Sequence, residues 1–384
     1  MKDKAIKVLS YVLTALAAVA LTLAVVVFSS WKPQSKLSQL EELIGEKFIG
    51  DVSVEDLEDA AADAMVQAMG DRWSYYMTAE EYQSYKEQMA NAYVGIGITV
   101  QADEQGLLVT QVSPGGGAEQ AGILAGDRVT AVDGQSLAGM DLDDITPLIK
   151  GDEGTTVELE ILRDAQAMNV TVKRMRIKTA VATGTMLEGN IGLVRIVNFD
   201  SRCAQETIAA IEDLRKQGAQ KLIFDVRYNP GGYKDELVKV LDYLLPEGLL
   251  FRSEYYDGTV NDDRSDAACL ELPMAVLVNG SSYSAAEFFA AALRDYDWAT
   301  VVGTQTCGKG YFQQTYPLND GSAVALSVGK YYTPGGVSLA EVGGLTPDKV
   351  VEVTEEQAAA IYAGTLEPAE DPQIQAAIAA LTNP

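Results

Sequence analysis

The decisive stretch of the sequence is MAVLVNGSSYSAAEFFAAAL, residues 274–293. Its first five residues, Met274–Val278, are all apolar and predict a strand that is buried on both faces. Asn279-Gly280 then turns the chain, and Ala285–Leu293 has the composition of a helix. The stretch therefore predicts a buried strand that leads through a short loop into a helix, which is the repeating unit of an α/β sheet.

The same alternation of strands and helices continues on both sides of this stretch. Before it, strands are expected at Ile191–Val197 and Lys221–Val226, and helices at Gln205–Gln217 and at about Lys234–Leu245. After it, a further strand is expected at Ala299–Val302. This part of the chain is therefore predicted to form an α/β core.

Ser284 stands where the helix of the decisive stretch begins. A helix N-terminus has free N–H groups and the positive end of the helix dipole, so it suits a nucleophile or an oxyanion site. Ser284-Ala285-Ala286-Glu287 is also a capping box, in which Ser284 caps the helix and Glu287 reaches back. The pattern alone favours the cap, but a nucleophile can occupy the same geometry.

A second candidate is the lysine in Gly308-Lys309-Gly310. If a strand follows, Lys309, Tyr311 and Gln313 point to one face of it. A buried ammonium loses solvation, which lowers the pKa of a lysine and lets the amine act as a base. Gln313 is then placed to hold the amine by a hydrogen bond. An exposed loop lysine is the commoner explanation of such a pattern.

Composition restricts the chemistry that the chain can perform. The sequence contains no histidine, which excludes a Ser-His-Asp triad, a Cys-His dyad and every His-ligated zinc site. Its three cysteines have no metal-binding spacing and no disulfide framework, so we expect neither a metal nor a cofactor. The formal net charge of -26 argues against nucleic acid as a partner.

The N-terminus predicts a membrane anchor. Three lysines, at positions 2, 4 and 7, precede an uncharged and mostly apolar run over residues 8–28, which is long enough for a transmembrane helix. The positive flank is expected to stay in the cytoplasm and the rest of the chain outside it. The alternative is a cleaved signal peptide with Ala18-Val19-Ala20 as its cleavage site.

The region between the anchor and the core has two parts. Residues 37–92 show apolar positions at helical spacing and predict a small helical segment. From Tyr93 to Lys178 short strands alternate with glycine turns, and this part resembles a PDZ domain. The resemblance rests on Gly95-Ile96-Gly97-Ile98 and on Ala121-Gly122-Ile123-Leu124-Ala125-Gly126-Asp127. Such a domain binds a peptide tail as an added strand, with loop N–H groups on its carboxylate.

The candidate residues also resemble a known family, the carboxyl-terminal processing peptidases, which use a Ser/Lys pair. Asn279-Gly280-Ser281-Ser282-Tyr283-Ser284-Ala285-Ala286-Glu287 is similar to the nucleophile motif of that family. Thr306-Cys307-Gly308-Lys309-Gly310-Tyr311-Phe312-Gln313 is similar to the motif of its base. Asp225-Val226-Arg227-Tyr228-Asn229-Pro230-Gly231-Gly232 is similar to its oxyanion loop. Ala286 and Cys307 depart from the residues that are common in the family, and neither departure removes a catalytic atom.

The resemblance implies a role for each of these residues. Ser284 is the nucleophile, Lys309 the base and Gln313 the third catalytic residue. The oxyanion donors are the N–H of Ala285 and an N–H of Gly231 or Gly232, and the pattern leaves open which glycine donates. Gly95, Ile96, Gly97 and Ile98 are the residues expected to bind the substrate tail.

The predicted architecture follows from these parts. It is an α/β protease core of the ClpP/crotonase type with an inserted β-rich PDZ domain, an N-terminal helical segment and one transmembrane helix. The expected parts are residues 1–7 in the cytoplasm, the anchor 8–28, the helical segment 37–92, the PDZ domain 93–178, the core 179–352 and a helical tail 353–384.

The expected activity is that of a membrane-anchored endopeptidase that works outside the cytoplasm. The resemblance implies C-terminal or unstructured segments of exported or membrane proteins as substrates. An adaptor protein and a homodimer are further expected partners. Two alternatives remain, a catalytically inert PDZ scaffold and a crotonase-like acyl enzyme, and the second lacks a basic cluster for the phosphates of its cofactor.

Overall fold

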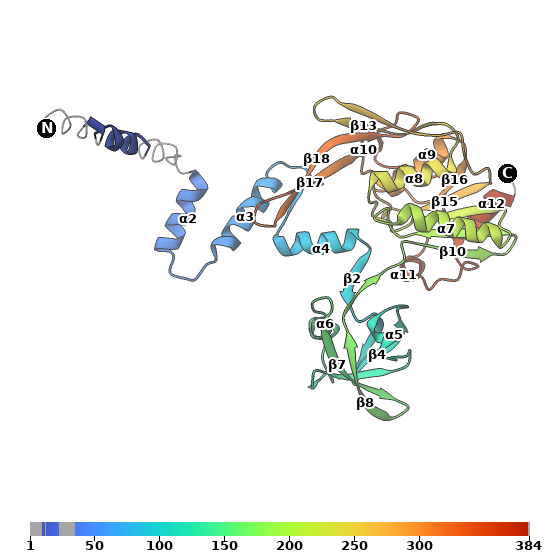
Figure 1. Cartoon of the computed structure of the whole chain (residues 1–384). Coiled ribbons are helices and arrows are strands. Elements are labelled where there is room, and N and C mark those ends of the chain that lie inside the picture. Colours follow the sequence, from blue (N-terminus) through green and yellow to red (C-terminus); the bar gives the residue numbers. More distant parts are fainter. Residues whose placement is uncertain (1–9, 12, 23–34, 383–384) are drawn as a thin grey trace. The chain divides into compact units, whose positions relative to one another are not determined.

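The computed structural model describes residues 10–11, 13–22 and 35–382 of the chain (Figure 1). It divides into two compact units, with the boundary between Tyr76 and Met77. The helices are α2 (Lys36–Lys47), α3 (Val54–Gln67), α4 (Ala79–Met89), α5 (Gly117–Gln120), α6 (Leu142–Ile149), α7 (Cys203–Lys216), α8 (Lys234–Leu244), α9 (Ala285–Asp295), α10 (Leu339–Val342), α11 (Glu355–Ala363) and α12 (Pro372–Thr382).

The strands begin at the boundary of the two units. They are β1 (Tyr75–Met77), β2 (Ala92–Gly95), β3 (Ile98–Asp103), β4 (Gly106–Val112), β5 (Arg128–Val132), β6 (Gln135–Ser136), β7 (Thr156–Arg163), β8 (Gln166–Lys173), β9 (Met175–Lys178), β10 (Ala182–Leu187), β11 (Ile191–Ile196), β12 (Lys221–Asp225), β13 (Gly248–Tyr255), β14 (Val260–Ser265), β15 (Met274–Val278), β16 (Ala299–Gly303), β17 (Tyr311–Pro317), β18 (Ala323–Tyr332) and β19 (Lys349–Val350).

The prediction of a transmembrane helix over residues 8–28 is wrong. Within the described ranges, no helix combines the length and the apolar character that crossing a membrane requires. Residues 8, 9, 12 and 23–28 of the predicted anchor lie outside the described residues, as do residues 1–7.

The first unit contains two capped helices. The Ser35 side chain accepts from the Ser38 N–H at the start of α2, and the Ser53 side chain accepts from the Asp56 N–H at the start of α3. None of the residues of α2 is buried, and three of its apolar side chains, Leu37, Leu40 and Leu43, are exposed. The range 37–92 contains α3, nearly all of α2, the strand β1 and α4, and its standing as a separate helical segment stays a prediction.

The PDZ-like part of the second unit is a small β-rich module. Its main sheet has the order β3-β4-β5-β7-β8, with β6 paired to β5. The chain enters through β2 and leaves through β9, and these two strands pair antiparallel, with Ala92 opposite Lys178. The module has its own apolar core, in which Leu107, Val129 and Leu159 are fully buried. It is therefore an insertion whose two chain ends lie side by side.

The catalytic candidates lie on an α/β core with three layers. Its six-stranded sheet has the order β10-β11-β12-β15-β16-β19, and all neighbours in it are parallel except β10 with β11. Successive residues of a strand face opposite sides of the sheet. Phe224 and Val276 accordingly pack with α7, α8 and α9, whereas Ile223 and Leu277 pack with α12 on the other face. A second sheet of β13, β14, β17 and β18 adjoins this core.

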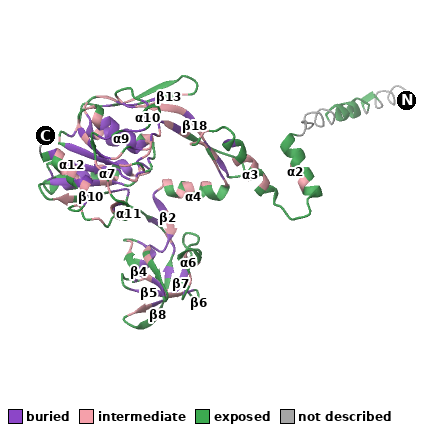
Figure 2. Cartoon of the chain, turned by 180° about the vertical axis from the view of Figure 1, so that it is seen from behind, coloured by how far each residue is buried: buried purple, intermediate pink, exposed green. Residues whose placement is uncertain are grey.

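Helix α9 is the most deeply buried helix of the described chain. Its first nine residues, Ala285–Leu293, are all buried, as Figure 2 shows by colour. The ring of Phe289 lies between Phe199 and Phe224, with centroid separations of 5.6 Å and 5.3 Å. Eight of these nine residues are apolar, which explains why the helix lies inside the molecule, and its burial fixes the place where it begins.

Candidate active site

Ser284 lies at the junction between β15 and α9. Its backbone has φ 50° and ψ −117°, a conformation that is rare for a residue with a side chain. The Glu287 N–H donates to the Ser284 carbonyl at 2.9 Å, and the Ser284 N–H donates to Glu287 Oε2 at 2.9 Å. The carbonyl and the N–H of Ser284 thus hold the strained turn. Such strain is characteristic of functional positions and persists only where surrounding contacts enforce it.

The Glu287 carboxylate connects this turn to the loop that carries Lys309. Its side chain is fully buried. Oε1 accepts from the Thr306 hydroxyl at 2.5 Å and from the Gly308 N–H at 2.7 Å. Oε2 accepts from the Lys309 N–H at 2.9 Å as well as from Ser284. One oxygen therefore holds the backbones of both candidate catalytic residues. The sequence pattern showed only the helix cap in this glutamate.

The glycines on either side of Lys309 are required by close packing. A Cβ on Gly308 would lie 2.9 Å from the Gly343 carbonyl carbon, and a Cβ on Gly310 would lie 2.5 Å from the Ala340 nitrogen. Lys309 itself is half-buried. The chain must therefore pass these two points without side chains, which explains the Gly-Lys-Gly pattern and holds the lysine in one place.

Gln313 lies on β17, directly after this loop. Its side-chain amide donates to Ser327 Oγ at 3.0 Å and to the Tyr311 carbonyl at 3.3 Å. The strand is irregular between Phe312 and Gln313. The amide orientation is therefore set by the neighbouring strand β18, which carries Ser327.

The loop with the expected oxyanion donors lies against Ser284, the candidate nucleophile. A Cβ on Gly231 would lie 2.9 Å from Ser284 Cβ and 3.1 Å from the Ala285 nitrogen. The Tyr283 N–H donates to the Asn229 carbonyl at 2.9 Å, which joins the two loops. The Gly231 N–H donates to Asn229 Oδ1 at 2.8 Å. Of the two expected glycine donors, Gly231 thus already uses its N–H within the loop.

The residues predicted to bind a substrate tail form a bent loop in the PDZ-like module. Gly97 has φ 81°, a backbone conformation that favours glycine. The Ile96 carbonyl accepts from the Ala118 N–H at 2.8 Å, and the Gly97 carbonyl accepts from the Ser113 N–H at 2.9 Å. Gly95 and Ile98 flank this bend and belong to β2 and β3. Strand β3 is at one end of its sheet, where a peptide can add as a strand.

Asp200 is a buried acid that sequence reasoning missed. Its side-chain Oδ1 has no hydrogen-bond partner in the described structure. A Cβ on Gly232 would lie 2.6 Å from that oxygen, so the carboxyl lies beneath the oxyanion loop. Burial raises the pKa of Asp200 to about 7. Nothing in the local sequence shows this, because the contact is made by a loop that is distant in the chain.

Arg227 is a second buried charge that the sequence did not single out. It lies between Asp225 and Asp371, at 2.7 Å and 2.8 Å, and all three side chains are almost fully buried. Burial lowers the pKa of the Arg227 guanidinium, but the two carboxylates outweigh burial and raise this pKa. The residue is therefore charged and immediately precedes the loop Tyr228-Asn229-Pro230-Gly231-Gly232.

The described residues contain no cluster of three or more Cys, Asp or Glu side chains that could hold a metal ion. The groups that are brought together here are the backbone N–H groups of Ser284 and Lys309, which donate to the same Glu287 oxygen, so a serine and a lysine lie next to each other in space. Such a set can carry out acyl transfer through a covalent intermediate.

Comparison with known proteins agrees with this site. The model of peptidase family S41 matches residues 190–351, and a PDZ domain model matches residues 108–163. The "Probable CtpA-like serine protease" of Staphylococcus aureus strain COL is 31% identical over 339 residues, which cover 86% of this chain and 68% of that protein.

The chain belongs to peptidase family S41.

A second relative is similar to this chain, and one solved structure shares its fold. The protein of the same name from Staphylococcus saprophyticus is 33% identical over 321 residues, which cover 83% of this chain. The chain spans 65% of the length of that relative. A solved S41-family chain from Bacteroides fragilis has the same fold, with a TM-score of 0.55 at 17% identity, and covers 92% of this chain and 98% of that one. The predicted resemblance and the PDZ domain are confirmed.

The first prediction concerns the Glu287 carboxylate. In Glu287→Gln, whichever oxygen becomes the NH₂ group, two donors that face it lose their acceptor. Each unsatisfied buried donor costs about 1–3 kcal/mol, so we expect the two to lower the free energy of unfolding by about 2–6 kcal/mol. Urea denaturation measures it, with the exposed Glu356→Gln as the control. A loss no larger than that of the control contradicts the role of Glu287.

The second prediction concerns Asp200 and pH. Its raised pKa means that the folded carboxyl stays neutral while the unfolded one ionises, so its contribution to stability is complete below about pH 4 and is lost as pH rises through about 7. Asp200→Asn removes this loss. The change that it makes in the free energy of unfolding should therefore be more favourable at pH 8.5 than at pH 4, by up to about 4 kcal/mol. Urea denaturation at both values tests this, with the exposed Asp213→Asn as the control. An equal effect of Asp200→Asn at the two pH values would refute it.

Proposed function

We propose that this chain is a serine endopeptidase in which Ser284 is the nucleophile and Lys309 is the general base. The observation that carries the proposal is the buried Glu287 carboxylate, because its Oε2 accepts the N–H groups of both residues. The family membership supports the class of reaction. The absence of histidine from the sequence leaves Lys309 as the candidate base beside this serine.

The proposed reaction proceeds through an acyl-enzyme. Lys309, as a neutral amine, takes the hydroxyl proton while Ser284 Oγ bonds to the carbonyl carbon of a peptide. The oxyanion that forms is held by the Ala285 N–H and by the Gly232 N–H, because the Gly231 N–H already donates to Asn229 Oδ1. The carbon–nitrogen bond then breaks, and the leaving amine takes the proton from Lys309. Water, deprotonated by Lys309, hydrolyses the ester and restores Ser284. Gln313 serves to orient the amine.

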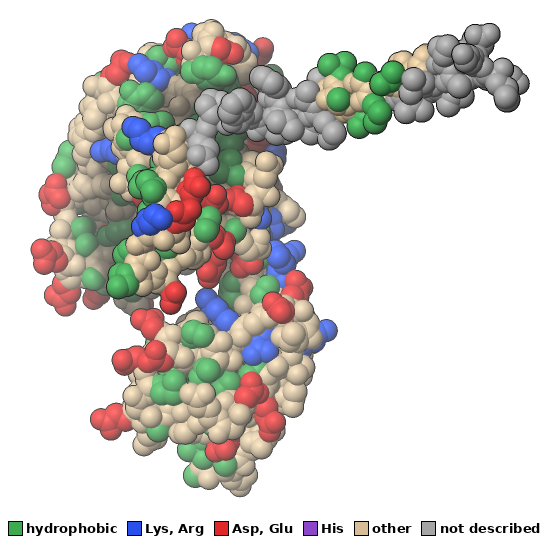
Figure 3. All heavy atoms as spheres, turned by 90° about the vertical axis from the view of Figure 1, so that its left-hand side faces the viewer, with side chains coloured by type: hydrophobic (Ala, Val, Ile, Leu, Met, Phe, Trp, Pro, Cys, Tyr) green, Lys and Arg blue, Asp and Glu red, His purple; other side chains and the backbone are tan. Residues whose placement is uncertain are grey.

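The proposed substrates are proteins with free, unstructured C-terminal tails. The edge strand β3 can pair with an extended tail, and the loop Gly95–Ile98 can hold its carboxylate with backbone N–H groups. Acidic side chains are abundant on the face in view in Figure 3, in line with 55 Asp and Glu against 29 Lys and Arg. This surface charge disfavours nucleic acid as an alternative partner.

Three finer parts of the proposal rest mainly on the sequence. The location outside the cytoplasm rests on the alternative interpretation of the N-terminus as a cleaved signal peptide, in which lysines at positions 2, 4 and 7 precede an apolar run that contains Ala18-Val19-Ala20. An adaptor protein is proposed by analogy with enzymes whose substrates are delivered as tails. A homodimer is proposed on the exposed leucines of α2, namely Leu37, Leu40 and Leu43.

The prediction is that Ser284→Ala and Lys309→Arg both abolish cleavage of casein while the fold persists. The first removes the attacking oxygen, and the second replaces the base by a guanidinium that stays protonated. Gel assays of casein cleavage with the full chain measure this, beside the exposed Lys239→Arg as the matched control. Cleavage by Ser284→Ala refutes the nucleophile, and cleavage by Lys309→Arg refutes the base.

A further inference from the structure

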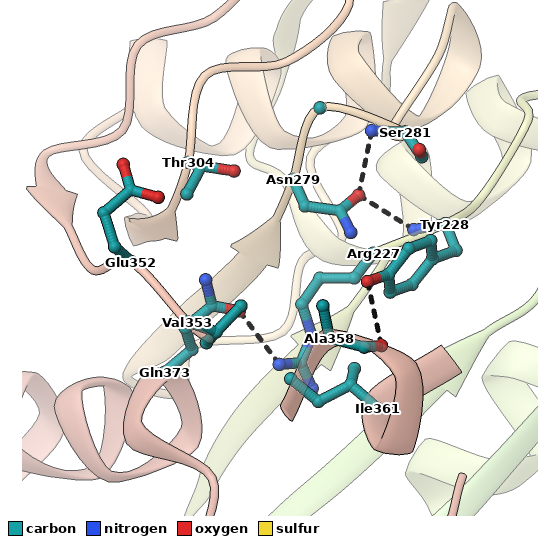
Figure 4. Close-up of a pocket in the computed structure, with 11 residues that line it drawn as sticks. Arg227, Tyr228, Asn279, Ser281, Thr304, Glu352, Val353, Ala358, Ile361 and Gln373 are labelled. Carbon is teal, nitrogen blue, oxygen red and sulfur yellow. Dashed lines mark hydrogen bonds between the residues drawn. The ribbon is translucent and has the colours of Figure 1, made fainter. Parts of the chain in front are cut away.

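The C-terminal segment is bonded to the loop that precedes the oxyanion donors, through a buried cluster around Arg227. Arg227 donates to Asp225 through Nε and Nη2 at 2.9 Å and 2.7 Å. Its remaining nitrogen, Nη1, contacts Asp371 Oδ2 at 2.8 Å and Gln373 Oε1 at 2.9 Å. Figure 4 shows the Gln373 contact. One side of the guanidinium thus bonds to Asp225, the last residue of β12, and the other side bonds to the C-terminal segment.

Asp371 has two separate partners for its two oxygens. Oδ1 accepts from the Gln373 N–H at 2.9 Å and from the Ile374 N–H at 3.1 Å, and so caps the start of α12. Oδ2 contacts Arg227. The side chain is only 2% exposed. A single buried carboxylate therefore joins the start of α12 to Arg227, and α12 is itself packed on the sheet by Ile374, Ala377 and Leu381.

Tyr228 extends the same connection by one residue. Its hydroxyl donates to the Ala358 carbonyl of α11 at 3.1 Å, and its ring lies 5.2 Å from the ring of Tyr362. Its N–H donates to Asn279 Oδ1 at 3.0 Å, and the same oxygen accepts from the Ser281 N–H at 3.1 Å (Figure 4). Tyr228 also has φ 59°, in the left-handed region. Arg227 and Tyr228, the two residues before Asn229, therefore both bond to the C-terminal segment, Arg227 at the start of α12 and Tyr228 on α11.

The interface between the C-terminal segment and these loops is partly hollow. A pocket of about 220 Å³ lies there, lined among others by Arg227, Tyr228, Asn279, Thr304 and Glu352 (Figure 4). Dense apolar packing therefore does not hold the loop at this point. On this side, the residues that precede Asn229 are held by the polar contacts to Asp371, Gln373 and Ala358.

We propose that the C-terminal segment positions the oxyanion loop, and that Asp371 is a positioning residue for catalysis. The inference rests on the proposed peptidase function. Asp371 does not touch the reacting atoms. It acts through Arg227, which precedes Gly231 by four residues in a loop that lies against Ser284 and Ala285. Small displacements of such a donor are costly, since a misplacement of about 1 Å in an active site can lower the rate by about 10²-fold.

The test uses two variants that keep the helix cap. Asp371→Asn retains the capping oxygen but turns an NH₂ group toward Arg227, and Asp371→Ser retains a capping hydroxyl that is too short to reach the guanidinium. Leu381→Ala is the matched control, because it loosens the packing of α12 on the sheet and leaves the ion pair intact. The full chain, Ser284→Ala and these variants are assayed for kcat and KM on fluorescein-labelled casein, and for the midpoint of urea denaturation.

The proposal predicts a specific loss of turnover. Asp371→Asn and Asp371→Ser should lower kcat by about 10²-fold and change KM less than about twofold. Leu381→Ala should keep kcat within about twofold of the unmodified chain, even where its denaturation midpoint falls as far as those of the Asp371 variants. Full kcat in a folded Asp371 variant, or an equal loss of kcat in Leu381→Ala, overturns the positioning role alone. No cleavage by the unmodified chain, or cleavage by Ser284→Ala, overturns the proposed function and this inference with it.

Discussion

The hydrogen bonds of the Glu287 carboxylate are the constraint on which the rest of the site depends. This side chain is fully buried at the start of α9, and its two oxygens accept four donors from two separate loops. A buried carboxylate is stable only when its oxygens are satisfied in this way. The same contacts hold Ser284 in a left-handed conformation and fix the backbone of Lys309. The requirement to satisfy one buried charge therefore brings the two candidate catalytic residues together.

Two other buried ionisable side chains, Arg227 and Asp200, contact the loop that carries Gly231 and Gly232, on the side away from Ser284. Arg227 is bonded between Asp225 and Asp371, and Asp200 lies beneath Gly232. Asp200, Arg227 and Glu287 follow the carboxyl ends of the parallel strands β11, β12 and β15, where α/β sheets usually place their sites. The apolar helix α9 and the sheet supply the rigid frame, and the buried polar groups set the positions of the loops. Each buried group adds specificity of position rather than a large gain in stability.

The sequence predicted the parts of the structure that depend on local pattern. The strand Met274–Val278 and a helix from Ala285 lie where they were expected, because an apolar run and a turn signal are visible in a single stretch. Asp200 and Asp371 could not be found in this way, since Asp371 meets Arg227 across 144 positions of the chain. For Glu287 the pattern revealed the bond to its own helix and not the three donors from the Lys309 loop. The transmembrane helix was wrong because apolar character was taken to imply a continuous helix of spanning length, which the described residues do not contain.

The most direct test of the account is to locate the reactive serine chemically. The full chain is treated with a fluorophosphonate, digested with trypsin and mapped by mass spectrometry, beside the Lys309→Ala variant. The account predicts one adduct within residues 265–294, which fragmentation places on Ser284, and little or none in the variant because the base is gone. An adduct on Ser281, Ser282 or another part of the chain, or equal labelling of Ser284 without Lys309, would contradict the assignment of this pair.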